Sequence, residues 1–115
     1  MRESHSYNWD YNNCYHLANR ERQQLGLKPL PKIDYRCFTS EYDIPYGYIK
    51  KELEKHCDII YQPRVGDLVL LDFNMIECLG VLSNESKIVY MNGLGRCEKD
   101  TERLSQYLKG FYRLR

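Results

Sequence analysis

Cys14 is the side chain of this sequence best placed to act as a nucleophile. The residues around it predict a helix that begins at Cys14, with Asn12 or Asn13 as its cap and Gly26 just past its end. Unpaired backbone N–H groups and the helix dipole at such an N-terminus stabilise a thiolate and lower the pKa of a thiol. A single cysteine on an apolar helix face is also a common core residue, so this position alone leaves a catalytic and a structural interpretation open.

A thiol nucleophile needs a general base, and the sequence offers three histidines. His16 follows Cys14 at a spacing of about 200° around a helix, so we expect its ring to point away from the thiol. His56 is expected at the end of a second helix, where a cation is favourable, and a structural interpretation is preferred there. His5 lies in the N-terminal segment, which would have to fold back to reach Cys14. A role as base stays open for each of them.

The remaining cysteines do not indicate a metal site or a disulfide framework. There are five in all, at positions 14, 37, 57, 78 and 97, and none forms a C-x-x-C pair. An odd number of widely spaced cysteines argues against zinc sites, iron–sulfur clusters and disulfide-rich domains. We therefore expect reduced thiols and no metal or cofactor.

Length, charge and hydropathy exclude several classes of protein. A chain of 115 residues fits one domain, residues 1–115, with one hydrophobic core. The 17 basic and 16 acidic residues nearly cancel, so no global field indicates binding to nucleic acid or to an anionic membrane. The chain has no bilayer-length apolar run and no secretory signal at its start, so we expect synthesis in the cytoplasm and no membrane insertion. Its 11 tyrosines suit protein–protein contacts and ordinary half-buried positions about equally.

The elements that would hold Cys14 in place run from helices to strands. After the first helix, residues 27–39 are expected to form an extended crossing loop, and a second helix runs from Pro45 to near His56. A short helix capped by Asp100 comes late in the chain. The pattern predicts an α+β domain. Its strands are expected at residues 68–73, 76–82, 87–91 and 111–114.

Three segments resemble the NlpC family of papain-like cysteine peptidases. Residues 11–17, followed by 24–27 and Pro31, are similar to the family's nucleophile helix and the segment after it. Residues 63–69 resemble the Pro-x-x-Gly-Asp-Leu start of its first core strand, and residues 110–113 resemble its closing strand. The match spans nearly the whole chain in the correct order and is most similar to the compact versions encoded among tail genes of long-tailed bacteriophages. The resemblance implies a papain-like fold, with N-terminal helices packed on a small antiparallel sheet.

By this resemblance Cys14 occupies the family's nucleophile position. The family's catalytic histidine, in contrast, is replaced in this sequence. That histidine belongs to a His-x-Gly-apolar motif on the second core strand, and here Cys78 stands in its place. A thiol cannot shuttle a proton between nucleophile and leaving amine near neutral pH as imidazole does. The third catalytic position falls near Tyr90 or Asn92. A shift of one residue in the strand would turn Glu77, rather than Cys78, toward the site.

The expected function follows from the missing base. We expect a non-catalytic NlpC-like domain that serves as a structural or assembly component of a phage tail tip, with other tail proteins as partners and the virion tail as its location. One alternative is an active peptidoglycan endopeptidase that cleaves stem peptides, with Cys14 as nucleophile and a relocated histidine as base. Another is an intracellular amide-processing enzyme on the same fold. The implied geometry makes Cys14 and Cys78 neighbours, reduced and packed or joined in a disulfide outside the cytoplasm, and we expect the reduced form.

Overall fold

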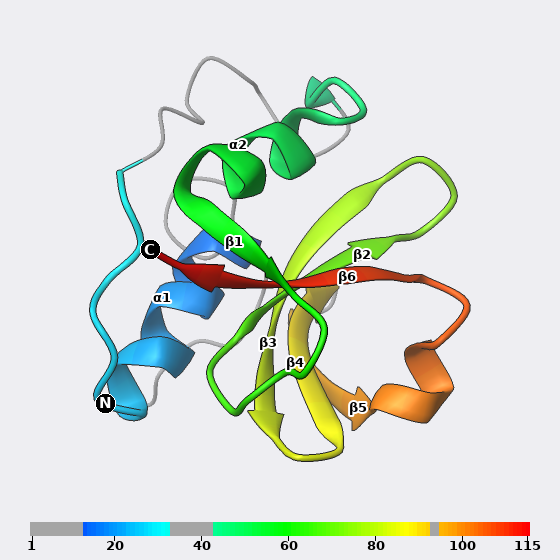
Figure 1. The fold of residues 1–115 in the computed structure, drawn as a ribbon. Helices are drawn as coiled ribbons and strands as arrows, with labels where there is room; N and C mark the ends of the chain where they lie inside the picture. Colours follow the sequence, from blue (N-terminus) through cyan, green and yellow to red (C-terminus); the bar gives the residue numbers. More distant parts are fainter. Residues whose placement is uncertain (1–12, 33–42, 93–94) are drawn as a thin grey trace.

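The computed structural model describes residues 13–32, 43–92 and 95–115, in which two helices pack against one antiparallel sheet of six strands (Figure 1). The strand order is β1-β6-β2-β3-β4-β5, so β6 lies between β1 and β2. The chain is therefore an α+β domain, as its sequence predicts. In chain order the elements are α1 (Cys14–Gln24), α2 (Tyr48–His56), β1 (Cys57–Ile60), β2 (Leu68–Asp72), β3 (Glu77–Asn84), β4 (Lys87–Asn92), β5 (Gly95–Asp100), a 3₁₀ helix (Thr101–Leu104) and β6 (Leu108–Leu114).

The helix α1 begins at Cys14 because Asn13 caps it. The Asn13 Oδ1 accepts a hydrogen bond from the His16 backbone N–H at 3.1 Å, and the His16 Nδ1 accepts one from the Asn13 backbone N–H at 3.2 Å. This reciprocal pair satisfies two backbone donors at the helix start. At the other end Gly26 has a φ of +76°, a left-handed conformation that stops the helix. The predicted start at Cys14 with Asn13 as cap is confirmed, whereas Asn12 lies outside the described residues.

The strand β2 is buried on both faces of the sheet. Its residues Leu68 and Leu70 belong to the cluster beside the helices, which also contains Ala18 of α1. Val69 and Leu71 belong to a separate cluster, because successive side chains of a strand point to opposite faces. None of these four β2 side chains is more than 2% exposed. Burial on both faces explains why β2 has a continuous apolar run rather than an alternating pattern.

An ion pair joins the start of β2 to β6. The Arg113 Nε and Nη2 donate to the two carboxylate oxygens of Asp67, each at 2.8 Å, and the Asp67 side chain is 5% exposed. Asp67 also accepts a hydrogen bond from the Arg64 backbone N–H at 2.7 Å. Beside it, Arg22 of α1 donates to the Gly66 carbonyl at 3.0 Å. Two of the three segments that carry the family resemblance are thus in direct contact, and α1 is tied to the same turn.

The structure corrects the predicted start of α2 and confirms its predicted end near His56. This helix begins at Tyr48 rather than Pro45, because Gly47 adopts a left-handed φ of +93° and serves as its N-cap. Cys57, the residue after this helix, begins β1, which pairs with β6 at the edge of the sheet and was not predicted from the sequence. The chain passes from helix to strand between His56 and Cys57 without a turn, so the sequence carries no turn signal at this boundary.

The strand β5 is absent from the sequence prediction, which places only a short helix capped by Asp100 in this part of the chain. Among the described residues β5 is an edge strand that pairs only with β4, and its side chains are mostly polar and exposed, so it lacks an alternating apolar pattern. The helix predicted after Asp100 is a 3₁₀ helix without a side-chain cap from that residue. The last strand begins at Leu108, earlier than predicted. The three other predicted strands correspond to β2, β3 and β4.

Candidate functional site

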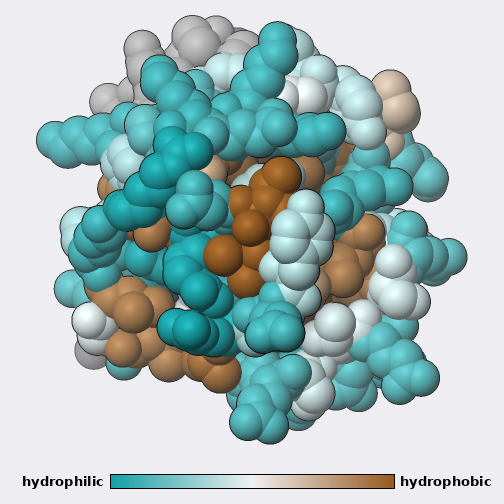
Figure 2. Space-filling view, viewed as in Figure 1, coloured by the Kyte–Doolittle hydropathy of each residue, from teal (hydrophilic) through white to brown (hydrophobic). Residues whose placement is uncertain are grey.

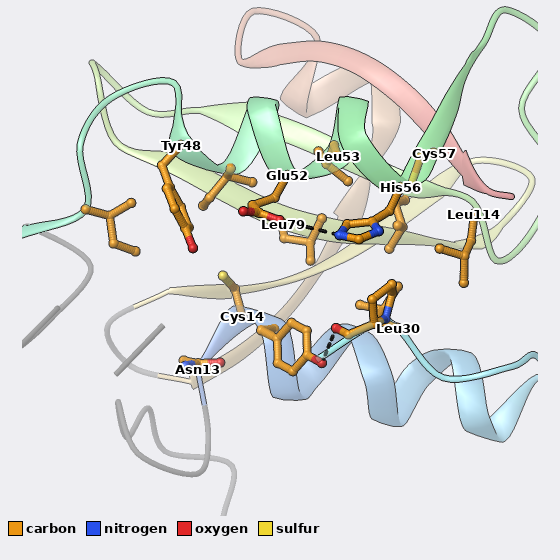
Figure 3. A pocket seen from close by; sticks show the side chains of 15 residues that line it. Asn13, Cys14, Leu30, Tyr48, Glu52, Leu53, His56, Cys57, Leu79 and Leu114 are labelled. Carbon is orange, nitrogen blue, oxygen red and sulfur yellow. Dashed lines mark hydrogen bonds and ion pairs between the residues drawn. The ribbon is translucent and has the colours of Figure 1, made fainter. Parts of the chain in front are cut away.

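A pocket opens between α1 and α2, and Cys14 lies on its wall (Figure 3). The residue is half-buried, and its sulfur points from the start of α1 toward α2. Glu52 and His56 of α2 lie on the facing wall. The rest of the lining is mainly apolar and consists of Asn13, Tyr15, Leu30, Pro31, Ile44, Tyr48, Ile49, Leu53, Cys57, Leu68, Leu79 and Leu114.

The Cys78 thiol interacts with the sulfur of Cys14. Cys78 belongs to β3, is 7% exposed, and its Sγ lies 3.5 Å from the Met91 carbonyl oxygen. Hydrogen bonding from Cys78 lowers the pKa of Cys14; burial opposes this effect, and backbone hydrogen bonds at Leu79 and Tyr15 reinforce it. The structure thus brings together the two residues to which the resemblance gives the nucleophile and base positions.

The same interaction has the opposite effect on Cys78. Hydrogen bonding to Cys14, followed by burial and the charge on Cys14, raises the pKa of Cys78 well above its ordinary value. Cys78 therefore keeps its proton under conditions in which Cys14 ionises. It can stabilise a thiolate at Cys14 by donating a hydrogen bond, but it cannot accept the proton that Cys14 loses.

The strand β3 has the register that turns Cys78, rather than Glu77, toward Cys14. The Glu77 Oε1 accepts hydrogen bonds from the backbone N–H of Gly47 at 2.9 Å and of Ile49 at 3.2 Å. These donors lie at the N-terminus of α2, where a carboxylate also interacts favourably with the helix dipole. Glu77 is therefore a cap for α2, and the alternative that places it beside the nucleophile thiol is wrong.

Tyr90 and Asn92, the candidates for the third catalytic position, both have structural contacts. Tyr90 is buried in the cluster that contains Cys78, with its ring centroid 5.6 Å from that of Phe73. Asn92 donates from Nδ2 to the Cys97 sulfur at 2.7 Å and accepts at Oδ1 from a backbone N–H of β5 at 3.1 Å. These contacts pack the core and fix the connection between β4 and β5. A role for either residue in orienting a base stays a prediction.

Neither histidine in the described part of the chain hydrogen-bonds to the Cys14 thiol. His16 belongs to the capping box of α1. The His56 Nε2 lies 3.6 Å from a carboxylate oxygen of Glu52, and its ring lies across the pocket from Cys14 (Figure 3). His5 lies outside the described residues. The Glu52–His56 pair was not predicted from the sequence, although its i, i+4 spacing on a predicted helix was a usable signal.

The described residues contain neither a metal-binding cluster nor a helix that could span a membrane. Within residues 13–32, 43–92 and 95–115, no group of three or more His, Cys, Asp or Glu side chains could hold a metal ion. No helix in these ranges is long and apolar enough to cross a bilayer.

Comparison with protein-family models, with curated proteins and with solved structures found no match.

Proposed function

We propose that this chain is an NlpC-type papain-like domain that does not hydrolyse amide bonds and serves as a structural or assembly component of a bacteriophage tail tip. Its partners are other tail proteins, and its location is the virion tail, after synthesis in the host cytoplasm. The order of elements supports this fold, because a helix with a cysteine at its first residue precedes an antiparallel sheet and packs on it. The ion pair of Asp67 with Arg113, which joins two family-like segments, supports it too. The family resemblance supports the phage tail.

The observation that carries the loss of hydrolysis is the Cys78 thiol beside Cys14. A general base must take the proton of the nucleophile and return it to the leaving amine, which requires a pKa near the working pH. The raised pKa of Cys78 prevents the first step near neutral pH. A thiolate at Cys14 can still attack a carbonyl, but without a base that takes up the proton of the nucleophile and returns it to the leaving amine, the tetrahedral intermediate expels the thiolate and reverts to the amide.

The pocket between α1 and α2 is suited to binding without cleavage. Its apolar walls, which include Ile49 and Leu53 of α2, favour an apolar side chain of a partner protein or of a stem peptide. Glu52 and His56 provide polar groups on one wall, which can fix the orientation of such a ligand. A domain that binds a partner without cleaving it stays attached to that partner. An assembly component requires such a stable attachment.

Exposed apolar side chains beside the edge strand β1 support a role in protein contacts. Tyr61 is 88% exposed and Ile59 is 47% exposed. Figure 2 shows apolar side chains surrounded by hydrophilic ones on this face of the molecule. An edge strand also presents backbone N–H and C=O groups to which a strand of another protein can pair. Together these features support a surface that a tail protein covers in the assembled particle.

An active peptidoglycan endopeptidase is the second candidate function, and two observations favour it. The pKa of Cys14 is lowered, and His56 with its partner Glu52 faces the same pocket. In this alternative His56 is the base and Glu52 orients it, as in other Cys–His sites. The helix α2 would have to approach α1, because no hydrogen bond joins His56 to Cys14 in the described structure.

Digestion of purified peptidoglycan distinguishes the two functions. We expect wild type, Cys14→Ser and His56→Ala to release new amino groups from cell-wall sacculi at the same background rate. Release by wild type that disappears in Cys14→Ser would contradict the proposal and establish a Cys14 peptidase. Disappearance in His56→Ala as well would identify the base.

The assembly role is tested on phage particles. Mass spectrometry of purified virions from a genome that encodes this chain should detect it at a fixed ratio to other tail proteins. Deletion of its coding sequence should prevent the formation of complete tails, as counted by electron microscopy. Detection in the lysate but not in virions, together with normal tails after deletion, would refute the assembly role.

A further inference from the structure

The proposed function does not use the reactivity of the two neighbouring thiols, Cys14 and Cys78. Cys14 lies at the start of α1, is half-buried and lines the pocket between α1 and α2, so this pocket is the route by which a small molecule would approach its sulfur. Cys78 is buried next to it, and Cys14 packs against the core cluster to which Cys78 belongs. An accessible thiol with a second thiol beside it is the arrangement that reversible thiol oxidation requires.

We propose that Cys14 and Cys78 are a site of reversible oxidation, at which a hydroperoxide oxidises Cys14 and Cys78 then closes a disulfide with it. This reaction is separate from amide hydrolysis, and it does not rest on the proposed function. The substrate class is a small hydroperoxide, with hydrogen peroxide as the simplest member. The disulfide is reversed by a dithiol, which is oxidised as the two cysteines are reduced.

The first step forms a sulfur–oxygen bond. The Cys14 thiolate attacks one peroxide oxygen, the O–O bond breaks, and the peroxide is reduced to an alcohol, or to water for hydrogen peroxide. In the second step the Cys78 sulfur attacks the sulfenic acid on Cys14. The S–S bond forms, the S–O bond breaks, and the departing hydroxide takes the Cys78 proton and leaves as water. Two thiols thus give up two electrons and two protons to one peroxide.

The unequal environments of the two thiols fit these two steps. Cys14 has the lowered pKa and the pocket, so it is the thiol that supplies a reactive thiolate to an incoming peroxide. The pKa of Cys78 is raised first of all by its hydrogen bond to Cys14. When Cys14 becomes a neutral sulfenic acid, Cys78 no longer has a thiolate to which it donates a hydrogen bond, and the main cause of its raised pKa is removed. Cys78 then loses its proton more easily, at the stage at which it must act as a nucleophile.

Two other cysteines provide internal comparisons. Cys57 is buried and also lines the pocket, and its raised pKa, caused first by burial, makes it a poor competitor for peroxide. Cys97 packs against the cluster that contains Cys78, and its sulfur accepts a hydrogen bond from Asn92 at 2.7 Å. Cys97 affects Cys78 only through charge, the weakest cause of its pKa shift. Cys14, unlike Cys97, also lines the pocket through which a peroxide would arrive, so the proposed disulfide joins Cys14 to Cys78 rather than Cys78 to Cys97.

The test treats the reduced full chain with hydrogen peroxide and measures its intact mass, then blocks the remaining thiols with N-ethylmaleimide and analyses tryptic peptides. Wild type should lose about 2 Da and give one Cys14–Cys78 cross-linked peptide, both reversed by dithiothreitol. Cys57→Ser, the matched control, should behave in the same way. Cys78→Ser should instead gain about 16 Da as a sulfenic acid on Cys14 that dimedone labels.

Three outcomes would overturn the proposal. The first is a wild-type protein in which Cys14 proceeds to the sulfinic acid without a disulfide. The second is a disulfide that joins any other pair, including Cys78 and Cys97. The third is a Cys14 that peroxide does not modify until the chain is unfolded in urea. None of these outcomes changes the expected result of the peptidoglycan assay, so failure here and failure of the proposed function are distinguishable.

Discussion

The contact between Glu77 of β3 and the start of α2 predicts a measurable loss of stability in Glu77→Ala. Gly47 occupies the N-cap of α2 and has no side chain, so the helix receives its cap from another element. The Glu77 carboxylate accepts hydrogen bonds from the backbone N–H of Gly47 and Ile49, at 2.9 and 3.2 Å. The substitution removes the acceptor of both donors and the negative charge at the positive end of the helix dipole.

The magnitude follows from these two losses. A missing helix cap costs about 0.5–2 kcal/mol, and a missing charge at a helix end costs about 0.3–1 kcal/mol. Because one carboxylate provides both effects, we expect the free energy of unfolding to fall by about 1–2 kcal/mol. For a domain of this length the midpoint of thermal unfolding should fall by about 4–8 °C. Glu77→Gln keeps an acceptor without the charge and should lose only about 0.5 kcal/mol.

Two measurements locate the effect. Urea unfolding followed by circular dichroism gives the change in free energy, and amide hydrogen exchange shows which element opens. Exchange should accelerate at Gly47, at Ile49 and through α2, while α1 stays protected. Glu85→Ala is the matched control, because Glu85 is an exposed turn residue between β3 and β4. The control should stay within about 0.5 kcal/mol of wild type.

The reasoning would be refuted by equal stabilities of Glu77→Ala and Glu85→Ala. It would also be refuted if Glu77→Ala accelerated exchange in α1 and left α2 protected. Either result would mean that the carboxylate does not hold α2 in place. The register of β3 that turns Cys78 toward Cys14 would then lose one of its supports.

Asp67→Asn should destabilise the domain more than Asp58→Asn. The Asp67 carboxylate is buried where it pairs with Arg113, whereas the ion pair of Asp58 with Arg115 is exposed and contributes at most about 1 kcal/mol. Urea unfolding of both variants measures which loss of free energy is larger. Leu70→Ala should cost about 2–5 kcal/mol, since Leu70 is fully packed between sheet and helices, and a smaller loss in the same assay would contradict that packing. Burial raises the pKa of Tyr112 in the folded state, so as pH rises this tyrosine loses its proton in the unfolded chain before it does so in the folded one. Stability should therefore fall as pH rises from about 9 to 11, less steeply in Tyr112→Phe, and equal slopes would disprove this cause.

Local signals in the sequence predicted the elements whose ends are fixed by their own residues. Asn13 caps α1 and Gly26 ends it, and both effects act within one helical turn, so a single sequence shows them. The apolar run that begins at Leu68 predicted β2 because burial on both faces requires it. In these cases the sequence pattern and the tertiary environment impose the same choice.

The edge strands were missed because their pairing depends on partners far away in the chain. In β5 most side chains are polar and exposed, so only its ladder with β4 makes it a strand. In β1 the ladder with β6 has the same role, and no turn separates it from α2. Edge strands of this kind carry little of the alternation that burial on one face imposes.

The meeting of Cys14 with Cys78 is a tertiary contact that no local pattern encodes. It was predicted through the family resemblance, and the structure brings the two thiols together. The opposite side of the pocket was not predicted. His56 was interpreted as a favourable helix-end charge, although Glu52 one turn earlier places both side chains on the face of α2 that lines the pocket.

The position of β6 in the sheet constrains how the chain folds during its synthesis. The ladders of β6 with β1 and β2 are the connection between β1 and the rest of the sheet, so the edge of β2 that faces β6 stays open until residues 108–114 have left the ribosome. Throughout that interval the apolar segment of β2 has an unpaired backbone edge, which chaperones and other nascent chains can bind. Slow translation of the segment between β5 and β6 would lengthen the exposure, whereas rapid translation would protect the chain from misassembly.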